Sequence, residues 1–269
     1  MDRDLQGGSD YGRDDARDVG DEPPASFRDT APDVLAPIDI SSPVSGHVPA
    51  PTTGGGHSIA ESPEHDWAAA APLLFPLLRP SGTQGMAVTD IDPAALASES
   101  SRNHSQPLLD EGPCELSVVY AIPATGFDVI VNGDHLVSWG VGVTDIQDAA
   151  LANLAAWSAT AAWTDEVSGE RRLISSDTGD GWDASRILLH EVRDKLTAEL
   201  GGAGRVLIGL PERHLMIAGA LRPGDDEFAA LFAEFVLESS GGADEPVDRR
   251  VFELVDGHLV EFAGLPTPA

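Results

Sequence analysis

Two residue types are nearly absent from this chain of 269 residues: cysteine and lysine each occur once, as Cys114 and Lys195. A single cysteine excludes a disulfide within the chain, and such a chain is typical of a reducing compartment. A lone thiol outside any paired motif is most often a small apolar core residue. We therefore expect Cys114 to be structural.

Positive charge is scarce, with 16 basic residues against 45 acidic ones and a net charge of −29. Such acidity opposes binding to nucleic-acid backbones and to anionic membrane surfaces, and it permits positively charged partners. We expect no nucleic acid and no membrane among the partners, whereas a protein partner fits. The acidity has two explanations, a GC-rich coding bias and adaptation to high salt. Stability that collapses at low salt would favour the second.

Long hydrophobic runs are missing as well. The longest, Ala68 to Leu78, has 11 residues and includes Pro72 and Pro76. It is too short for the ~20 residues of a membrane-spanning helix. The chain begins Met-Asp-Arg-Asp without an apolar stretch, so we expect no secretory signal. These features predict a soluble, cytoplasmic protein.

Residues 1–66 have no sustained apolar periodicity and carry 14 acidic residues against 4 arginines. Such a segment buries too little apolar surface to offset its chain entropy, so we predict a disordered acidic tail over 1–66. Residues 67–269 are long enough for one domain with a sizeable core.

Regular structure is predicted mainly after residue 115. The prolines within 67–80 predict an extended edge segment. Residues 81–112 have the composition of a loop, in which a short helix at 93–97 is conceivable. Strands are expected at 116–122, 127–131 and 171–175. Thr144 and Gln147 form a capping box that opens a helix.

The second half alternates helices and hairpins. Asp183 is expected to cap a helix with an apolar stripe of Leu188, Val192, Leu196 and Leu200, ended by a Gly-Gly pair. Residues 205–210 and 214–218 read as a hairpin, and Asp225 opens another helix. Asp256-Gly257 predicts a final hairpin of 251–255 and 258–262. The order favours an α+β fold, with a largely antiparallel sheet built from hairpins and about three packed helices.

The stretch from Gly179 to Arg186 concentrates two carboxylates, a hydroxyl and an arginine at the mouth of a predicted helix. In an architectural interpretation, Asp183 caps the helix by accepting from amides near Ser185 and Arg186, and Arg186 pairs with a carboxylate. In a functional interpretation, the helix amides, the Ser185 hydroxyl and Arg186 bind a phosphate or carboxylate. The candidate ligand-binding residues are then Asp180, Gly181, Asp183, Ser185 and Arg186.

The segment Asp180-Gly-Trp-Asp-Ala-Ser-Arg186 is similar to the DG-aromatic-DASR pattern of the YtpQ-like family of bacterial proteins. Further similarity lies in Val119-Tyr-Ala121, in Ala152-Asn-Leu154, in Val206-Leu-Ile-Gly-Leu-Pro211 with Leu215-Met-Ile-Ala218, and in Pro76-Leu-Leu-Arg79. The resemblance covers roughly residues 68–262 and implies a single α+β domain over 67–269. It implies no activity, because no reaction is established for the family.

Known catalytic and cofactor motifs are absent from the sequence. There is no nucleophile elbow, phosphate loop or dinucleotide fingerprint, so we predict no cofactor and no catalytic residue. Asp177, Asp180 and Asp183 lack the spacing of an EF-hand loop, and no metal is predicted. Ser185 and His190 stand five residues apart on one predicted helix, about 140° around its axis, which opposes a triad with Asp194.

Two functions follow from these observations. The first is a non-catalytic binding or interaction module, indicated by the missing catalytic motifs, the acidic tail and a hairpin-rich sheet whose edges can accept partners. The alternative is a small-ligand-binding protein or enzyme with its site at the helix mouth, Asp180 to Arg186, where two carboxylates near an arginine can support acid–base chemistry.

Overall fold

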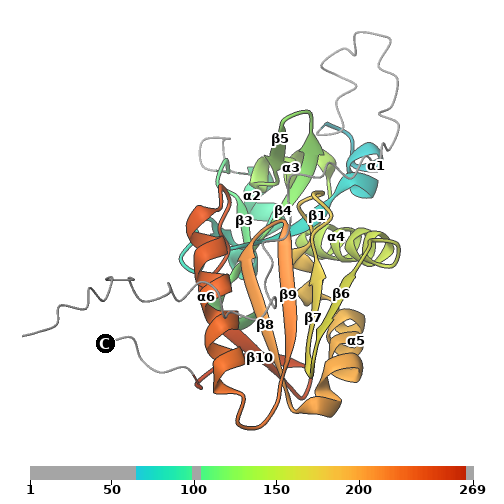
Figure 1. The fold of residues 1–269 in the computed structure, drawn as a ribbon. Helices are drawn as coiled ribbons and strands as arrows, with labels where there is room; N and C mark the ends of the chain where they lie inside the picture. Colours follow the sequence, from blue (N-terminus) through green and yellow to red (C-terminus); the bar gives the residue numbers. More distant parts are fainter. Residues whose placement is uncertain (1–64, 99–103, 265–269) are drawn as a thin grey trace, which may run out of the picture. The chain divides into compact units, whose positions relative to one another are not determined.

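Two mostly antiparallel sheets organise the computed structural model, which describes residues 65–98 and 104–264 (Figure 1). These residues lie in one compact unit, Thr52–Ala269. The predicted acidic tail lies outside the described residues, apart from His65 and Asp66. The fold is α+β, with mostly antiparallel sheets, as the sequence predicts.

The first sheet has the strand order β1-β4-β3-β2, and β5 also pairs with β4. Only the β2–β3 pair is parallel. The helices α1, α2, α3 and α4 accompany this sheet in the sequence. The element bounds are α1 Trp67–Ala70, β1 Phe75–Arg79, β2 Met86–Ala87, α2 Pro93–Ser98, β3 Leu108–Glu111, β4 Ser117–Ala124, β5 Phe127–Ile130, α3 Gly133–Trp139 and α4 Val143–Ser158.

The second sheet has six strands in the order β11-β10-β8-β9-β7-β6, all antiparallel. Its elements are β6 Thr164–Ser168, β7 Arg171–Ser176, α5 His190–Leu200, β8 Arg205–Glu212, β9 Leu215–Leu221, α6 Asp226–Gly242, β10 Val251–Val255 and β11 His258–Glu261. Short 3-10 turns complete the list at η3 Ala71–Leu73, η4 Val88–Asp90, η5 Pro113–Glu115, η6 Ala184–Leu188 and η7 Gly201–Ala203.

Side chains of the six-stranded sheet alternate between two hydrophobic clusters, because successive strand residues point to opposite faces. Leu207 packs with Phe228 and Phe232 of α6 on one face. Ile208 belongs to the larger cluster on the other face, which includes Leu196 of α5 and the interior residues of the first sheet. The six-stranded sheet therefore separates α6 from α5, and Figure 1 shows these two helices on either side of it.

Several predicted elements are confirmed. The Asp256-Gly257 turn has φ values of 51° and 77° and places Leu254 opposite Leu259. Positive φ at both central residues is the geometry that two-residue hairpins favour. Asp225 caps α6 by accepting a hydrogen bond from the Phe228 amide at 3.2 Å. The predicted edge segment contains β1, which is an edge strand of its sheet.

Other expectations are wrong. Residues 81–112 include β2, η4 and β3 in addition to loop and to α2, which confirms the short helix expected at 93–97. Helix α1 and turn η3 precede β1. Helix α4 begins at Val143 rather than at a Thr144 cap: the Gly142 amide donates to Asp145, and Gln147 donates to Asp110 instead. Strand β6 was not expected, because four of its five residues are exposed and it has no apolar pattern.

The predicted long helix from Asp183 is interrupted. Residues 184–188 form the 3-10 turn η6, Leu189 is extended with φ −80° and ψ 131°, and α5 begins only at His190. Val192, Leu196 and Leu200 form the buried stripe of α5 as expected. Leu188 lies before the helix and is only partly buried.

Candidate functional site

The segment from Asp180 to Arg186 runs from the loop after β7 into η6 and lies where the two sheets meet. Turn η6 packs against β1 and α4 on one side and against β8 and β9 on the other. Asp183, Ser185 and Arg186 are 0, 2 and 0 % exposed. The candidate residues are thus brought together by the fold, and most of them are inside the protein.

Asp183 binds back to the strand that precedes it. Its carboxylate accepts hydrogen bonds from the Ser176 hydroxyl at 2.5 Å, from the Thr178 amide at 3.2 Å and from the Thr178 hydroxyl at 2.9 Å. It makes no capping hydrogen bond to η6. The expected helix cap is therefore wrong, because the donors of β7 and the following loop occupy the carboxylate.

Arg186 is the largest fully buried side chain among the described residues. Its guanidinium donates to the Ser158 hydroxyl and carbonyl, both at 2.9 Å, and to the Ala162 carbonyl at 3.3 Å. It also lies 3.7 Å from the centre of the Trp163 ring. These contacts tie η6 to the end of α4 and to the loop that leads into β6.

A hydroxyl group links the two buried charges. Ser176 accepts from Arg186 Nη1 at 2.7 Å while donating to Asp183. The expected pairing of Arg186 with a carboxylate is thus indirect. A buried charge is tolerated only when it is paired and hydrogen-bonded, and this relay meets both needs.

Ser185 covers the outer edge of the first sheet. Its hydroxyl accepts a hydrogen bond from the Leu78 amide of β1 at 3.1 Å. Strand β1 pairs with β4 on its other side, so this amide would otherwise have no partner in the ladder. Pro76 has the same orientation as Leu78 along the strand and has no N–H to satisfy, which suits an edge position.

Arg213, in the turn between β8 and β9, fixes the start of the motif. Its Nε donates to the Gly181 carbonyl at 3.3 Å, and its Nη1 contacts Asp128 at 2.6 Å and Glu245 at 2.7 Å. Gly181 has φ 84°, and a Cβ there would lie 2.7 Å from the Arg213 guanidinium. Only glycine combines this backbone conformation with so close an approach.

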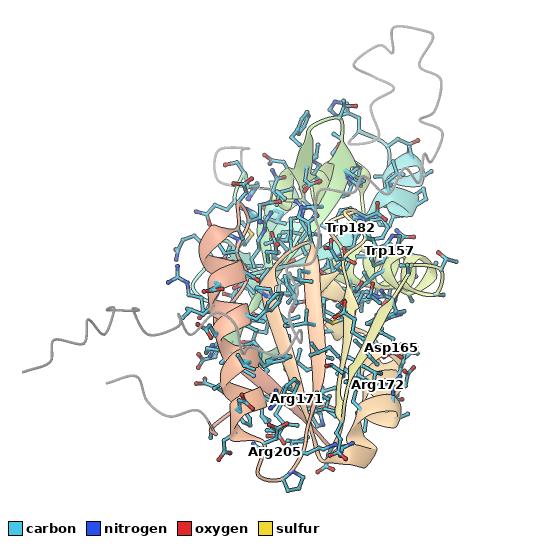
Figure 2. All side chains as sticks on the ribbon, viewed as in Figure 1. Trp157, Asp165, Arg171, Arg172, Trp182 and Arg205 are labelled. Atoms are coloured by element: carbon cyan, nitrogen blue, oxygen red, sulfur yellow. The ribbon has the colours of Figure 1, made fainter. Side chains whose placement is uncertain are left out.

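Trp182 packs between the sheets. Its ring stacks on Phe75 of β1 with centroids 4.4 Å apart, and the Arg213 guanidinium lies 5.5 Å from it. Glu245, which pairs with Arg213, also forms an ion pair with Arg79 at the end of β1, at 3.0 Å. Figure 2 labels Trp182 near β1 and Trp157 on α4.

Asp180 differs from the other candidates because it is exposed. Its carboxylate accepts a hydrogen bond from Trp157 Nε1 at 2.9 Å. The motif therefore has one solvent-facing carboxylate and a buried set of Asp183, Ser185 and Arg186. A ligand that used the buried set would have to displace hydrogen bonds that the protein already makes.

Burial shifts both buried charges toward their neutral forms. Removal from water raises the pKa of Asp183, against the effect of its hydrogen bonds and of Arg186. The same cause lowers the pKa of Arg186 to about 10. Arg186 remains charged at neutral pH, and its charge costs stability that the surrounding hydrogen bonds offset.

We expect acid to destabilise Asp183→Asn more steeply than the wild type. The pKa of Asp183 is raised above 3.8, so its protonation adds stability as the pH falls through that pKa. A hydrogen bond from Lys195 lowers the pKa of Glu199, and one from Arg171 lowers the pKa of Asp225. The stability that these two carboxylates contribute is lost as the pH falls through their lowered pKa values. Asp183→Asn has no carboxyl group to protonate at this position, so in acid it only loses the stability contributed by Glu199 and Asp225. Urea midpoints from pH 7 to pH 3 test this, and parallel curves would contradict it.

The contact partners Ser158, Ser176, Trp163 and Arg213 were not among the predicted site residues. They lie before the motif or well after it in the sequence, and no local pattern connects them to it. Lys195, on α5, pairs with Glu199 of the same helix. His190 contacts Asp194 at 3.3 Å on the surface, whereas Ser185 is buried, so the structure separates the members of the disfavoured triad.

In residues 65–98 and 104–264, no group of three or more His, Cys, Asp and Glu side chains could hold a metal ion. None of the helices in that part combines the length and apolar character needed to cross a bilayer. No protein-family model, curated protein or solved structure matches this chain. The resemblance to the YtpQ-like family stays a prediction from the motifs.

Proposed function

We propose that this protein is a non-catalytic interaction module of the cytoplasm that binds an extended, positively charged segment of a partner protein along β6. The observation that carries the proposal is the open edge of the six-stranded sheet. Strand β6 is the last strand of that sheet and pairs only with β7 among the described residues. A free strand edge can accept a further strand through main-chain hydrogen bonds.

The sheet register identifies which peptide groups face outward. The Val251 carbonyl accepts a hydrogen bond from the Phe262 amide at 2.9 Å, so the peptide groups of Val251 point away from β8. In an antiparallel ladder the direction alternates residue by residue. Carried through the registers of β10, β8, β9 and β7, this alternation directs the N–H and C=O groups of Asp165 and Val167 away from β7.

Other parts of the protein provide hydrogen-bond partners for the edge strands β11 and β1. At the opposite end of the sheet, the Cys114 thiol donates to the outward carbonyl of Leu259 at 3.1 Å. At β1, Ser185 accepts from Leu78. No hydrogen bond between described residues reaches the outward peptide groups of Asp165 or Val167. Val167 is also 68 % exposed, the largest value among the exposed large hydrophobic residues described.

The charge near β6 selects the partner. The segment from Thr164 to Glu170 has three acidic residues and no basic one. Asp165 contacts Arg172 at 2.7 Å and Glu170 contacts Arg222 at 2.6 Å. Glu166 is exposed and forms no ion pair with a described residue. Figure 2 labels Asp165 and Arg172 beside each other. Like charges oppose pairing of this edge with a second copy of itself. A lysine- or arginine-bearing strand complements it, in keeping with the net charge of −29.

The alternative function, a ligand site or enzyme at Asp180 to Arg186, has less support. Asp183, Ser185 and Arg186 are buried and hydrogen-bonded within the protein, and these bonds join structural elements. An enzyme needs its reactive groups within reach of a substrate. Of the charged side chains in the motif, only Asp180 meets that requirement as the protein stands.

Replacing Val167 with proline should strongly weaken the binding of an added strand without disturbing the sheet. The Val167 N–H points outward, so proline removes a docking donor and no bond to β7, and proline is tolerated on edge strands. The probe is a fluorescein-labelled peptide, Lys-Thr-Lys-Val-Lys-Thr-Lys, followed by fluorescence anisotropy. We expect wild-type binding that weakens with added salt and at least a tenfold weaker affinity for Val167→Pro.

Val167→Thr is the matched control, because it keeps the N–H and the β-branched side chain. It should bind the peptide as the wild type does. A peptide with glutamate in place of lysine should not bind. Equal affinity of Val167→Pro and Val167→Thr, or no binding of the lysine peptide at low salt, would overturn the proposal.

A further inference from the structure

A pocket of about 200 Å³ opens beyond the end of η6, on the side of the protein formed by η5, α5 and the β10–β11 turn. Its apolar lining comes from Pro113, Ile187, Leu188 and Leu259, and Arg193, Gly257 and His258 complete it. None of the residues assigned to the motif lines it. The pocket is independent of β6 and of the function proposed above.

Arg193 is the charged group of this pocket. Its Nη1 donates to the Ile187 carbonyl at 2.7 Å and to the Leu188 carbonyl at 2.9 Å. These two bonds hold the guanidinium at the end of η6. Most other described arginines form ion pairs with carboxylates, but no ion pair among the described residues includes Arg193.

One side of the guanidinium is left unused. Arg193 Nε is buried and has no hydrogen-bond partner. No hydrogen bond joins Nη2 to another described residue. The N–H groups of Nε and Nη2 point in parallel along one side of a planar guanidinium, and this fork matches the two oxygens of a carboxylate. A buried donor without a partner costs stability, and a bound carboxylate would remove that cost.

We infer that this pocket binds a carboxylate carried on a short apolar body, with the two oxygens on Arg193 Nε and Nη2. The apolar body contacts Ile187, Leu188 and Leu259, while His258 lies at the pocket as a further polar group. The volume lies below the roughly 300–1,000 Å³ of typical ligand sites, which excludes nucleotides and other large cofactors. Two sources supply this chemistry, a free small carboxylic acid and the C-terminal carboxylate of a peptide.

The full chain is titrated with butanoate and benzoate, and with the tripeptide Ala-Val-Leu, while amide chemical shifts are followed by NMR. Butyramide, benzamide and the amidated tripeptide are the matched neutral probes. We expect carboxylates to shift the amides of Leu188, Gly257 and His258, and the neutral probes to leave them unchanged. Binding of the free acids alone identifies a small-molecule site, and binding of the tripeptide alone identifies a site for chain ends.

Arg193→Gln should weaken carboxylate binding at least tenfold. Arg249→Gln removes the same charge from an exposed position and should change the affinity less than twofold. Equal shifts with acids and amides, no shift with any carboxylate, or unchanged affinity in Arg193→Gln would each overturn the inference. The comparison of acids with amides uses the wild type, so it decides the question even if Arg193→Gln fails to fold.

Discussion

Replacing Arg186 with alanine should lower the free energy of unfolding by about 4 kcal/mol, because it breaks a buried charge pair and leaves a cavity. The change removes the donors to the Ser158 carbonyl and hydroxyl and to Ser176, and it empties the space beside Trp163. Asp183 would remain as a buried carboxylate without its cation. Urea unfolding measures the loss as a lower midpoint at unchanged slope.

A second substitution separates the charge from the packing. Asp183→Asn in the Arg186→Ala background should recover part of the loss, because it removes the carboxylate that has lost its counter-charge. Arg249→Ala, at an exposed arginine, should change stability by less than about 0.5 kcal/mol. A loss below about 1 kcal/mol in Arg186→Ala would show that the relay through Ser176 is not needed for the fold.

Replacing Trp182 with alanine should cost about 3–4 kcal/mol, within the range for a buried tryptophan. Trp182 is 6 % exposed and stacks on Phe75, so its removal takes apolar contact from β1 of the first sheet. It also deprives Arg213 of an aromatic neighbour. The free energy of unfolding in urea again measures the effect.

Trp182→Phe is the matched control for the stack. It keeps an aromatic face toward Phe75 and should lose less than about half of the alanine effect. Equal losses in both variants would mean that the bulk of the indole, rather than the stacked face, fills the space between the sheets.

Elements stabilised by local sequence signals were predictable from the sequence. The Asp256-Gly257 hairpin depends on two residues that tolerate positive φ, and its register follows directly. Helix α6 has a capping aspartate and a buried stripe that includes Phe228 and Phe232. In both cases the residues that determine the structure are neighbours in the chain.

The geometry around Asp183 could not be predicted in this way. Its position before a helix favours a cap, but Ser176 and Thr178 supply three donors and draw the carboxylate toward β7. Strand β6 lacks an apolar pattern because nearly all its residues are exposed, so only its pairing with β7 reveals it. The partners of Arg186 come from α4, from the loop after it and from Ser176 of β7, and no spacing rule connects them to the motif.

The Asp180–Arg186 segment joins the two sheets and covers the edge of the first one. Hydrogen exchange at the Leu78 amide of the wild type tests this claim most directly. An outward amide on an edge strand exchanges quickly unless something accepts its hydrogen bond. We predict that Leu78 is protected as strongly as Leu77, whose peptide groups face β4. Fast exchange at Leu78 beside slow exchange at Leu77 would contradict the claim.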